Sequence, residues 1–254
     1  MGDIRALLIA AMVLSLTSSC ATIDSGARLK RARAKEALGN SLILEGRLEA
    51  GLKELLEAAT LDPTNPHIQN SIGLAYRDLG KYQEAIIHFK KALELKPNFP
   101  ETDNNLGTVY LLLKDWEKAI ECFRRAAENI YYPTPYIAYT NLGTVYHVKG
   151  DFQKAIRYYQ KAIRHLRAYG PAHDNLGLAY QALRRWDDAE EAFKQAIKCA
   201  PEAPKPRLHL ARLYLSLGLK KEAKKELLQV VKLDKDGPYG REAGKLLMEL
   251  TEKR

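Results

Sequence analysis

Apolar and small side chains return along this chain at a fixed spacing of about 34 residues. The clearest unit contains, in order, Ile72, Gly73, Tyr76, Ala85, Phe89 and Ala92. Copies follow around Gly107, Gly143 and Gly177. Within each unit the apolar positions lie three or four residues apart, which is the spacing along one face of an α-helix. A period of this length predicts paired helices that bury their apolar faces against neighbouring pairs. The pattern therefore predicts an all-α solenoid with almost no strand.

The same frame continues in weaker form on both sides of the four clear copies. An upstream copy begins at Leu38-Gly39, and a downstream copy begins at Leu210-Ala211. The predicted pairs lie at residues 32–65, 66–99, 100–133, 136–169, 170–203 and 204–237. Residues 238–254 are amphipathic and are predicted to form a helix that caps the last pair against solvent.

Glycines occupy two recurring places in these pairs. Inside the first helices they stand at 73, 107, 143 and 177, and at the ends of the first helices at 46, 80, 150 and 218. A glycine inside a helix costs about 1 kcal/mol relative to alanine, so the first group indicates that the two helices of a pair press together there. The second group suits a left-handed residue after a helix. Lys114 and Arg184 replace that glycine in two pairs, and we expect those turns to be tightened or reshaped.

Over residues 32–237 the chain resembles the tetratricopeptide (TPR) repeat family. That family has a small residue at repeat positions 8, 20 and 27, an aromatic residue at 11 and 24, and often proline at 32. In the second repeat these places hold Gly73, Ala85, Ala92, Tyr76, Phe89 and Pro97. The resemblance implies a right-handed superhelical solenoid of six helix-turn-helix repeats plus a C-terminal capping helix, which binds other proteins.

The first helix of each repeat should line the inner face, so its side chains at positions 5, 6, 9 and 12 are the candidates for partner binding. We select Asn70, Leu74, Arg77, Asn105, Thr108, Asn141, Thr144, His147, Asn175, Leu178 and Gln181. Asn105, Asn141 and Asn175 share one phase. A side-chain amide donates and accepts, so these residues can pair with a peptide backbone, although asparagine can also simply suit the repeat helix.

The amino terminus carries a second signal. Residues 6–16 are an apolar run of 11 residues, too short to span a bilayer, and they resemble the hydrophobic part of a secretory signal. Cys20 follows small residues, which resembles a bacterial lipoprotein signal, although Thr17 stands where that family usually has leucine. The resemblance implies a signal peptide at 1–19, lipidation of Cys20 and a short tether at 20–31. The alternative is secretion with cleavage near Ala21, which gives a soluble periplasmic protein.

Motifs for chemistry are missing from the sequence. There is no HExxH or GxSxG motif, and the six histidines are scattered. Cys122 and Cys199 lie two repeats apart, too far for a disulfide, and neither belongs to a CxxC motif. We therefore expect no enzymatic activity, no cofactor and no metal site.

Charge changes sign from repeat to repeat. Residues 136–169 and 204–237 each carry a net charge of +5, whereas three other repeats carry −2, within a total of +9. This alternation argues against a continuous stripe that follows nucleic-acid phosphates. The basic second helices in these two repeats are most often solvated faces, with anionic lipid or an acidic partner as the alternative.

A lipoprotein signal followed by six TPR repeats resembles the type IV pilus pilotin family. The resemblance implies an outer-membrane lipoprotein, facing the periplasm, that binds a secretin subunit and supports secretin assembly. The alternatives are a TPR scaffold lipoprotein of another envelope complex, such as polysaccharide export or cell-wall machinery, and a soluble TPR adaptor. Near the predicted anchor, residues 42–44 are apolar, and we expect at least one of them to be exposed as a docking spot.

Overall fold

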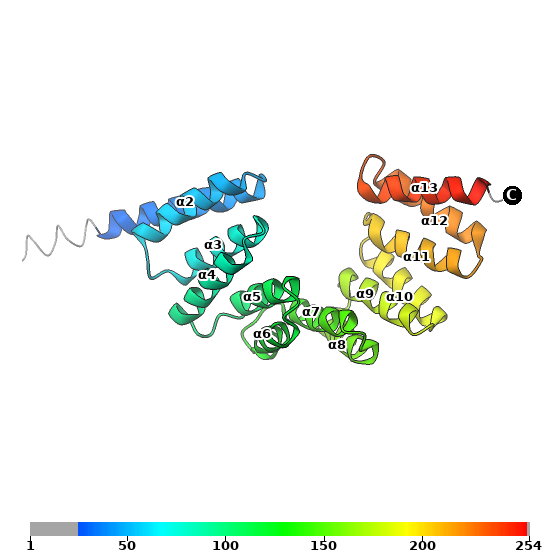
Figure 1. Cartoon of the computed structure of the whole chain (residues 1–254), viewed down its shortest axis with the longest axis horizontal. Coiled ribbons are helices and arrows are strands. Elements are labelled where there is room, and N and C mark those ends of the chain that lie inside the picture. Colours follow the sequence, from blue (N-terminus) through cyan, green and yellow to red (C-terminus); the bar gives the residue numbers. More distant parts are fainter. Residues whose placement is uncertain (1–24, 253–254) are drawn as a thin grey trace, which may run out of the picture. The chain divides into compact units, whose positions relative to one another are not determined.

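The computed structural model describes residues 25–252, and this range consists of helices joined by short connections, with no strand (Figure 1). The chain divides into two compact units, unit 1 up to Leu113 and unit 2 from Lys114. The all-α solenoid predicted from the sequence is confirmed. The predicted signal peptide and Cys20 lie outside the described residues.

Helix bounds follow the predicted period closely. Unit 1 contains a helix at residues 25–44, then α2 (Leu48–Leu61), α3 (Pro66–Asp78), α4 (Tyr82–Leu95) and α5 (Pro100–Leu112). Unit 2 contains α6 (Trp116–Glu128), α7 (Pro135–Val148), α8 (Phe152–His165), α9 (Gly170–Ala182), α10 (Trp186–Cys199), α11 (Pro204–Ser216), α12 (Lys220–Leu233) and α13 (Pro238–Glu252). From the second repeat on, each first helix begins within one residue of the predicted repeat start. The first repeat differs, because residues 25–31, assigned to a tether, already belong to its first helix.

Local sequence explains where the helices begin. Proline stands in the first turn of α3, α5, α7, α9 and α11, where its missing N–H costs nothing and its fixed φ suits a helix. The Asn65 side chain accepts hydrogen bonds from the backbone N–H groups of His67 and Ile68 at the start of α3. Asp115 and Asp151 accept in the same way at the starts of α6 and α8. The chain thus marks the helix starts locally.

The turns inside the helix pairs correct one prediction. Gly46, Gly80, Gly150 and Gly218 all have φ between 72° and 80°. Lys114 and Arg184 adopt the same left-handed conformation, with φ of 60° and 56°. The expectation that these two turns are reshaped is therefore wrong. They keep the glycine geometry, at a cost of about 1–2 kcal/mol for a residue with a Cβ atom.

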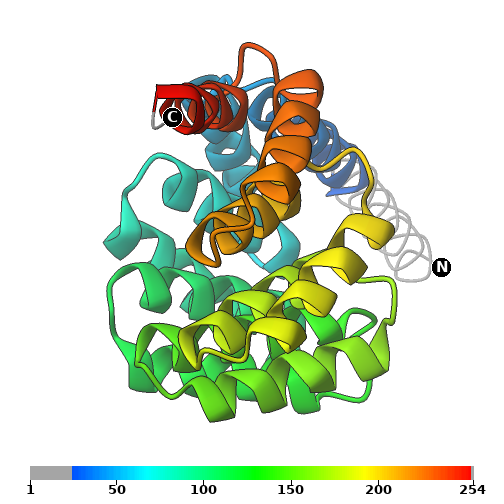
Figure 2. The same cartoon turned by 90° about the vertical axis from the view of Figure 1, so that its right-hand side faces the viewer.

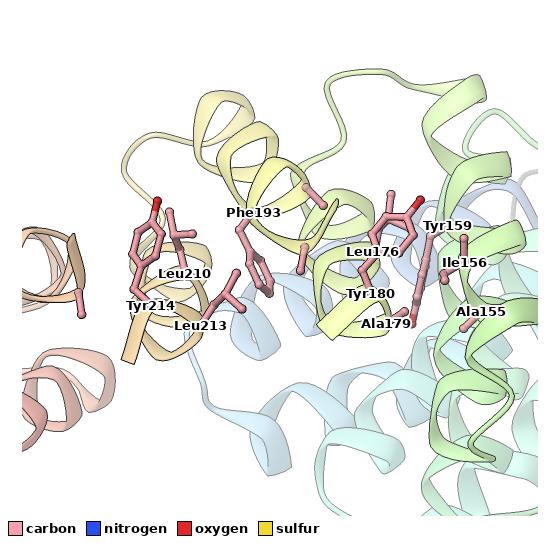
Figure 3. Packing of buried hydrophobic residues seen from close by; sticks show 13 residues of the cluster. Ala155, Ile156, Tyr159, Leu176, Ala179, Tyr180, Phe193, Leu210, Leu213 and Tyr214 are labelled. Carbon is pink, nitrogen blue, oxygen red and sulfur yellow. The ribbon is translucent and has the colours of Figure 1, made fainter. Parts of the chain in front are cut away.

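Three glycines inside the first helices, Gly73, Gly143 and Gly177, lie under aromatic rings of the second helices. A Cβ atom on Gly73 would lie 2.6 Å from Phe89, and one on Gly177 would lie 2.6 Å from Phe193. Both rings are fully buried. In unit 2 the core continues from α8 through α12, with Tyr159, Phe193 and Leu213 among its buried side chains (Figure 3). Within each unit, a helix pair therefore closes on itself and then packs on the next helix of that unit.

The first helices of successive pairs form one layer in each unit. In unit 1, α3 contacts α5. In unit 2, α7, α9, α11 and α13 contact one another in sequence, and Figure 2 shows the unit 2 pairs following one another from green to red. The second helices α8, α10 and α12 make no such backbone approach to each other within unit 2. The closer spacing of the first helices makes them the inner layer of each unit.

The last helix packs on the repeats, whereas the first helix of the first repeat ends on an exposed leucine. Ala243 of α13 is fully buried against a cluster that includes Leu208, Leu227 and Val230, so α13 caps the last pair. In the first repeat Leu42 is buried, whereas Leu44 is 90 % exposed. The prediction that at least one residue of 42–44 is exposed is confirmed for Leu44.

Candidate functional site

The candidate surface consists of the first-helix side chains that reach the open side of the inner layer. All eleven residues selected from the sequence are half-buried: Asn70, Leu74 and Arg77 on α3, Asn105 and Thr108 on α5, Asn141, Thr144 and His147 on α7, and Asn175, Leu178 and Gln181 on α9. Two surfaces result. We call those on α3 and α5 the unit 1 inner surface, and those on α7 and α9 the unit 2 inner surface.

Two of the selected amides bind each other in unit 1. The Asn70 Oδ1 atom accepts a hydrogen bond from Asn105 Nδ2 at 3.1 Å and a second one from the Thr102 hydroxyl at 3.0 Å. These bonds join α3 to α5, and we call the three residues the amide junction. One amide N–H of Asn105 is therefore used in a contact between repeats, which favours the interpretation that this asparagine suits the repeat fold rather than binding a partner.

A charged group fills the corresponding place in unit 2. Asp174 Oδ1 lies 2.7 Å from His209 Nδ1, and its other carboxylate oxygen lies 3.6 Å from Lys205 Nζ. Asp174 and His209 are 35 residues apart, as are Asn70 and Asn105. We call Asp174, His209 and Lys205 the acidic junction.

The acidic junction shows what sequence reasoning missed. Asp174 occupies a repeat position that we expected to face the groove, yet it is 3 % exposed. Ser71, Asn104 and Thr140, expected on the same face, are also buried. His209 was not selected at all, although it shares the phase of Asn175. The separation of 35 residues between positions 5 and 6 of successive repeats was the signal available for both junctions.

The unit 2 inner surface retains two side-chain amides with no hydrogen bond inside the fold. Within the described residues, neither the Asn175 side chain nor the Gln181 side chain has a hydrogen-bonding partner, and Leu178 lies between them on α9. Leu178 packs partly on the unit 2 core. Asn175 and Gln181 are therefore the selected residues whose donors and acceptors remain available to a ligand.

The selected hydroxyl groups point along their own helices. Thr108 donates to the Asn104 carbonyl oxygen, and Thr144 donates to the Thr140 carbonyl oxygen, each at 3.0 Å. Their donors are used within the helix, so toward a partner these hydroxyls can act as acceptors. Arg77 is paired with Asp78 at 2.7 Å, which offsets much of its charge.

His147 is neutral on this surface. Its Nδ1 atom is buried and has no hydrogen-bond partner, and its ring meets the Phe152 ring edge to face. Burial lowers the pKa of His147 from its ordinary value of 6.5, because the charged form would lose hydration. The exposed part of the ring therefore offers a neutral polar contact at pH 7.

Other site types find no support in the described range. Between residues 25 and 252, no group of three His, Cys, Asp or Glu side chains is placed to hold a metal ion. Cys122 is buried and Cys199 is half-buried, and neither forms a disulfide within residues 25–252. No described helix combines the length and hydropathy that crossing a membrane requires.

Family models match most of the repeat region. Models described as tetratricopeptide repeat match residues 99–168, 134–202 and 182–246, and one described as TPR repeat matches residues 73–114. No curated protein matches the sequence as a relative.

Several solved structures share the fold. PilF of Pseudomonas aeruginosa superposes with a TM-score of 0.71 at 19 % identity, over 85 % of this chain and 97 % of PilF. PilW, described as a widely conserved type IV pilus biogenesis factor, gives 0.73 at 22 % identity, over 83 % of this chain and 96 % of PilW. The APC/C hetero-tetramer Cut9–Hcn1 gives 0.71 at 20 % identity, over 90 % of this chain but 45 % of the matched chain. At such identities the likeness shows the fold alone.

Proposed function

The chain belongs to the tetratricopeptide repeat family, and from this premise we propose that it is a non-enzymatic lipoprotein that binds a partner protein on its inner surfaces. We further propose a pilotin-like role, in which the partner is a secretin subunit of the outer membrane and the process is type IV pilus biogenesis. The lipid on Cys20 would hold the protein at the outer membrane, on the periplasmic side.

One observation carries the pilotin-like proposal. The likeness to PilF and PilW extends over nearly the whole of those two chains, whereas it covers less than half of the matched chain of the Cut9–Hcn1 assembly. The protein therefore matches a type IV pilus biogenesis factor in size as well as in fold. The lipoprotein-like sequence around Cys20 supports the same role.

The unit 2 inner surface suggests how a partner is held. Asn175 and Gln181 lie six residues apart on α9 and offer free side-chain amides, with Leu178 between them. Such a face can pair with the backbone of a peptide segment while Leu178 contacts an apolar side chain. Each new hydrogen bond contributes about 0.5–1.5 kcal/mol, so several contacts together are needed for a stable complex.

Affinity capture tests the partner. The protein is used to recover binding proteins from detergent-solubilised membranes, and the affinity of any recovered secretin subunit is measured for the wild type and for Asn175→Ala/Gln181→Ala. We expect secretin recovery and at least a tenfold weaker affinity in the variant. Gln153→Ala/Gln229→Ala, which removes two exposed amides from second helices, is the matched control and should bind like the wild type.

Recovery of polysaccharide-export or cell-wall proteins without a secretin would overturn the pilotin-like role and favour a scaffold for that machinery. Anchoring is tested separately by labelling with a radioactive fatty acid, comparing the wild type with Cys20→Ser. We expect label on the wild type alone. An unlabelled wild type would leave a soluble adaptor.

A further inference from the structure

The helix at residues 25–44 begins with a stretch whose residues are all exposed. Every residue from 25 to 31 is exposed, and Ala32 is the first buried side chain. Most helical stability in proteins comes from packing, so two unpacked turns are marginal in water. A surface that binds these turns would stabilise them.

This stretch is basic and lacks acidic residues. Residues 25–35 contain five Lys or Arg side chains and no Asp or Glu. Lys35 alone is paired, with its Nζ atom 2.7 Å from Glu54 and 2.6 Å from Glu57. The other four side chains, which we call the basic cluster, make no ion pair within the described residues: Arg28, Lys30, Arg31 and Arg33.

Two exposed leucines lie on one side of this helix together with Lys30 and Arg33 of the basic cluster. At 100° per residue, Leu29, Lys30, Arg33 and Leu44 fall within an arc of about 100° that begins about 60° from the buried Ala32, and we call this arc the outward face. Arg28 and Arg31 lie on the other side of Ala32. Leu29 is 39 % exposed and Leu44 is 90 % exposed. A face of exposed leucine and Lys/Arg without acids is typical of helices that lie in the interface of a bilayer.

From this geometry we infer that the outward face of residues 25–44 binds the surface of an anionic phospholipid bilayer. Positive charge complements the lipid phosphates, and Leu29 and Leu44 contact the boundary with the acyl chains. The inference deepens the proposed anchoring function and rests on it for the membrane at which it operates. The described helix begins five residues after Cys20, so a lipid chain and a basic cluster would act together, as stable anchoring requires.

Vesicle binding without the lipid tests the inference. Residues 21–254 contain every helix of the described structure and lack Cys20. Their partition onto vesicles of phosphatidylcholine with 30 % phosphatidylglycerol is compared with pure phosphatidylcholine by co-sedimentation. We expect binding to the anionic vesicles only. Since each Lys or Arg near such a surface contributes about fivefold, Arg28→Gln/Lys30→Gln/Arg31→Gln/Arg33→Gln should weaken partition at least a hundredfold.

A matched control removes the same charge elsewhere. Lys220, Lys221, Lys224 and Lys225 on α12 are also exposed, and replacing these four by Gln should leave binding nearly unchanged. Circular dichroism should show that both variants stay folded, because none of the eight side chains is buried. Equal loss in both variants, equal binding to neutral vesicles, or no binding by the wild type would overturn the inference. Partner capture and fatty-acid labelling should be unaffected by the first variant, so they fail independently.

Discussion

The amide junction of unit 1 and the acidic junction of unit 2 solve one structural problem with different chemistry. Each joins the first helices of two successive repeats through side chains 35 residues apart. In unit 1 the acceptor is the neutral amide of Asn70, whereas in unit 2 it is the buried carboxylate of Asp174. The first exchanges neutral hydrogen bonds, and the second holds a charge away from water.

On the inner layer, some polar side chains join successive repeats and others remain available to a partner. Both junctions use repeat positions 5 and 6, so polar residues there are partly consumed by the contact between repeats. Asn175 has the phase of Asn105 but no partner in the described fold. Residues at position 6 are therefore not equivalent, and the free amide of Asn175 is a better candidate for binding than the engaged amide of Asn105.

The largest effect should come from removing the carboxylate of the acidic junction. Asp174→Ala leaves His209 and Lys205 without their acceptor, and we expect the free energy of unfolding to fall by about 2–3 kcal/mol in urea denaturation. Asp174→Asn rebuilds the chemistry of the amide junction and should retain most of the stability. If the two substitutions destabilise equally, the junction does not depend on an acceptor at this place.

The amide junction should be weaker. Asn70→Ala removes the acceptor of two neutral hydrogen bonds, and we expect a loss of about 1–2 kcal/mol in the same assay. Asn175→Ala serves as the control in unit 2, and it should change stability by less than about 0.5 kcal/mol because its amide is unpaired. A larger loss for Asn175→Ala would mean that the fold uses this amide after all.

The turns of the two pairs that carry Asn70 and Asp174 differ in whether the residue with positive φ is a glycine, so glycine and arginine can be exchanged in both directions. The pair that carries Asn70 turns at Gly80, and the pair that carries Asp174 turns at Arg184, both with positive φ. Arg184→Gly should raise the free energy of unfolding by about 1 kcal/mol, and Gly80→Arg should lower it by a similar amount. Lys149→Gly is the control, because Lys149 has φ of −72° and gains nothing from glycine. A destabilising Arg184→Gly would contradict the assigned backbone strain.

The smallest effect should be a pH dependence beside the amide junction. His88 Nδ1 donates a hydrogen bond to Oε1 of the buried Gln69 at 2.8 Å, and burial lowers the pKa of His88 from its ordinary value of 6.5. The unfolded chain therefore binds a proton more readily, so the stability from neutral His88 is present above pH 6.5 and is lost as the pH falls below it.

We expect His88→Gln to flatten the dependence of the unfolding free energy on pH between 5 and 7 by a fraction of a kcal/mol. His165→Gln, at an exposed histidine, is the control. An unchanged slope for His88→Gln would show that this histidine is protonated equally in both states.

The repeat fold could be predicted from the sequence because its signals lie within single helices or single helix pairs. The recurring glycines, the aromatic residues that cover them and the prolines at helix starts each report on one helix or one pair. Their spacing placed Gly73 under Phe89 and the first helices at their observed starts. The helix at 25–31 escaped detection because exposed basic residues carry no apolar period.

From residue 32 on, the sequence by itself determined which segments are helices, how they pair and which helices form the inner layer, since these follow from contacts within one repeat period. Only the tertiary structure decided which polar side chains on that layer are already hydrogen-bonded within the fold. Asn70 is hydrogen-bonded to Asn105, Asp174 is buried against His209, and the Asn175 side chain has no partner in the described fold. The difference arises because each of these contacts depends on the side chain that the next repeat presents. A helical period fixes direction along one helix, but a hydrogen bond between repeats requires the spacing and rotation of two.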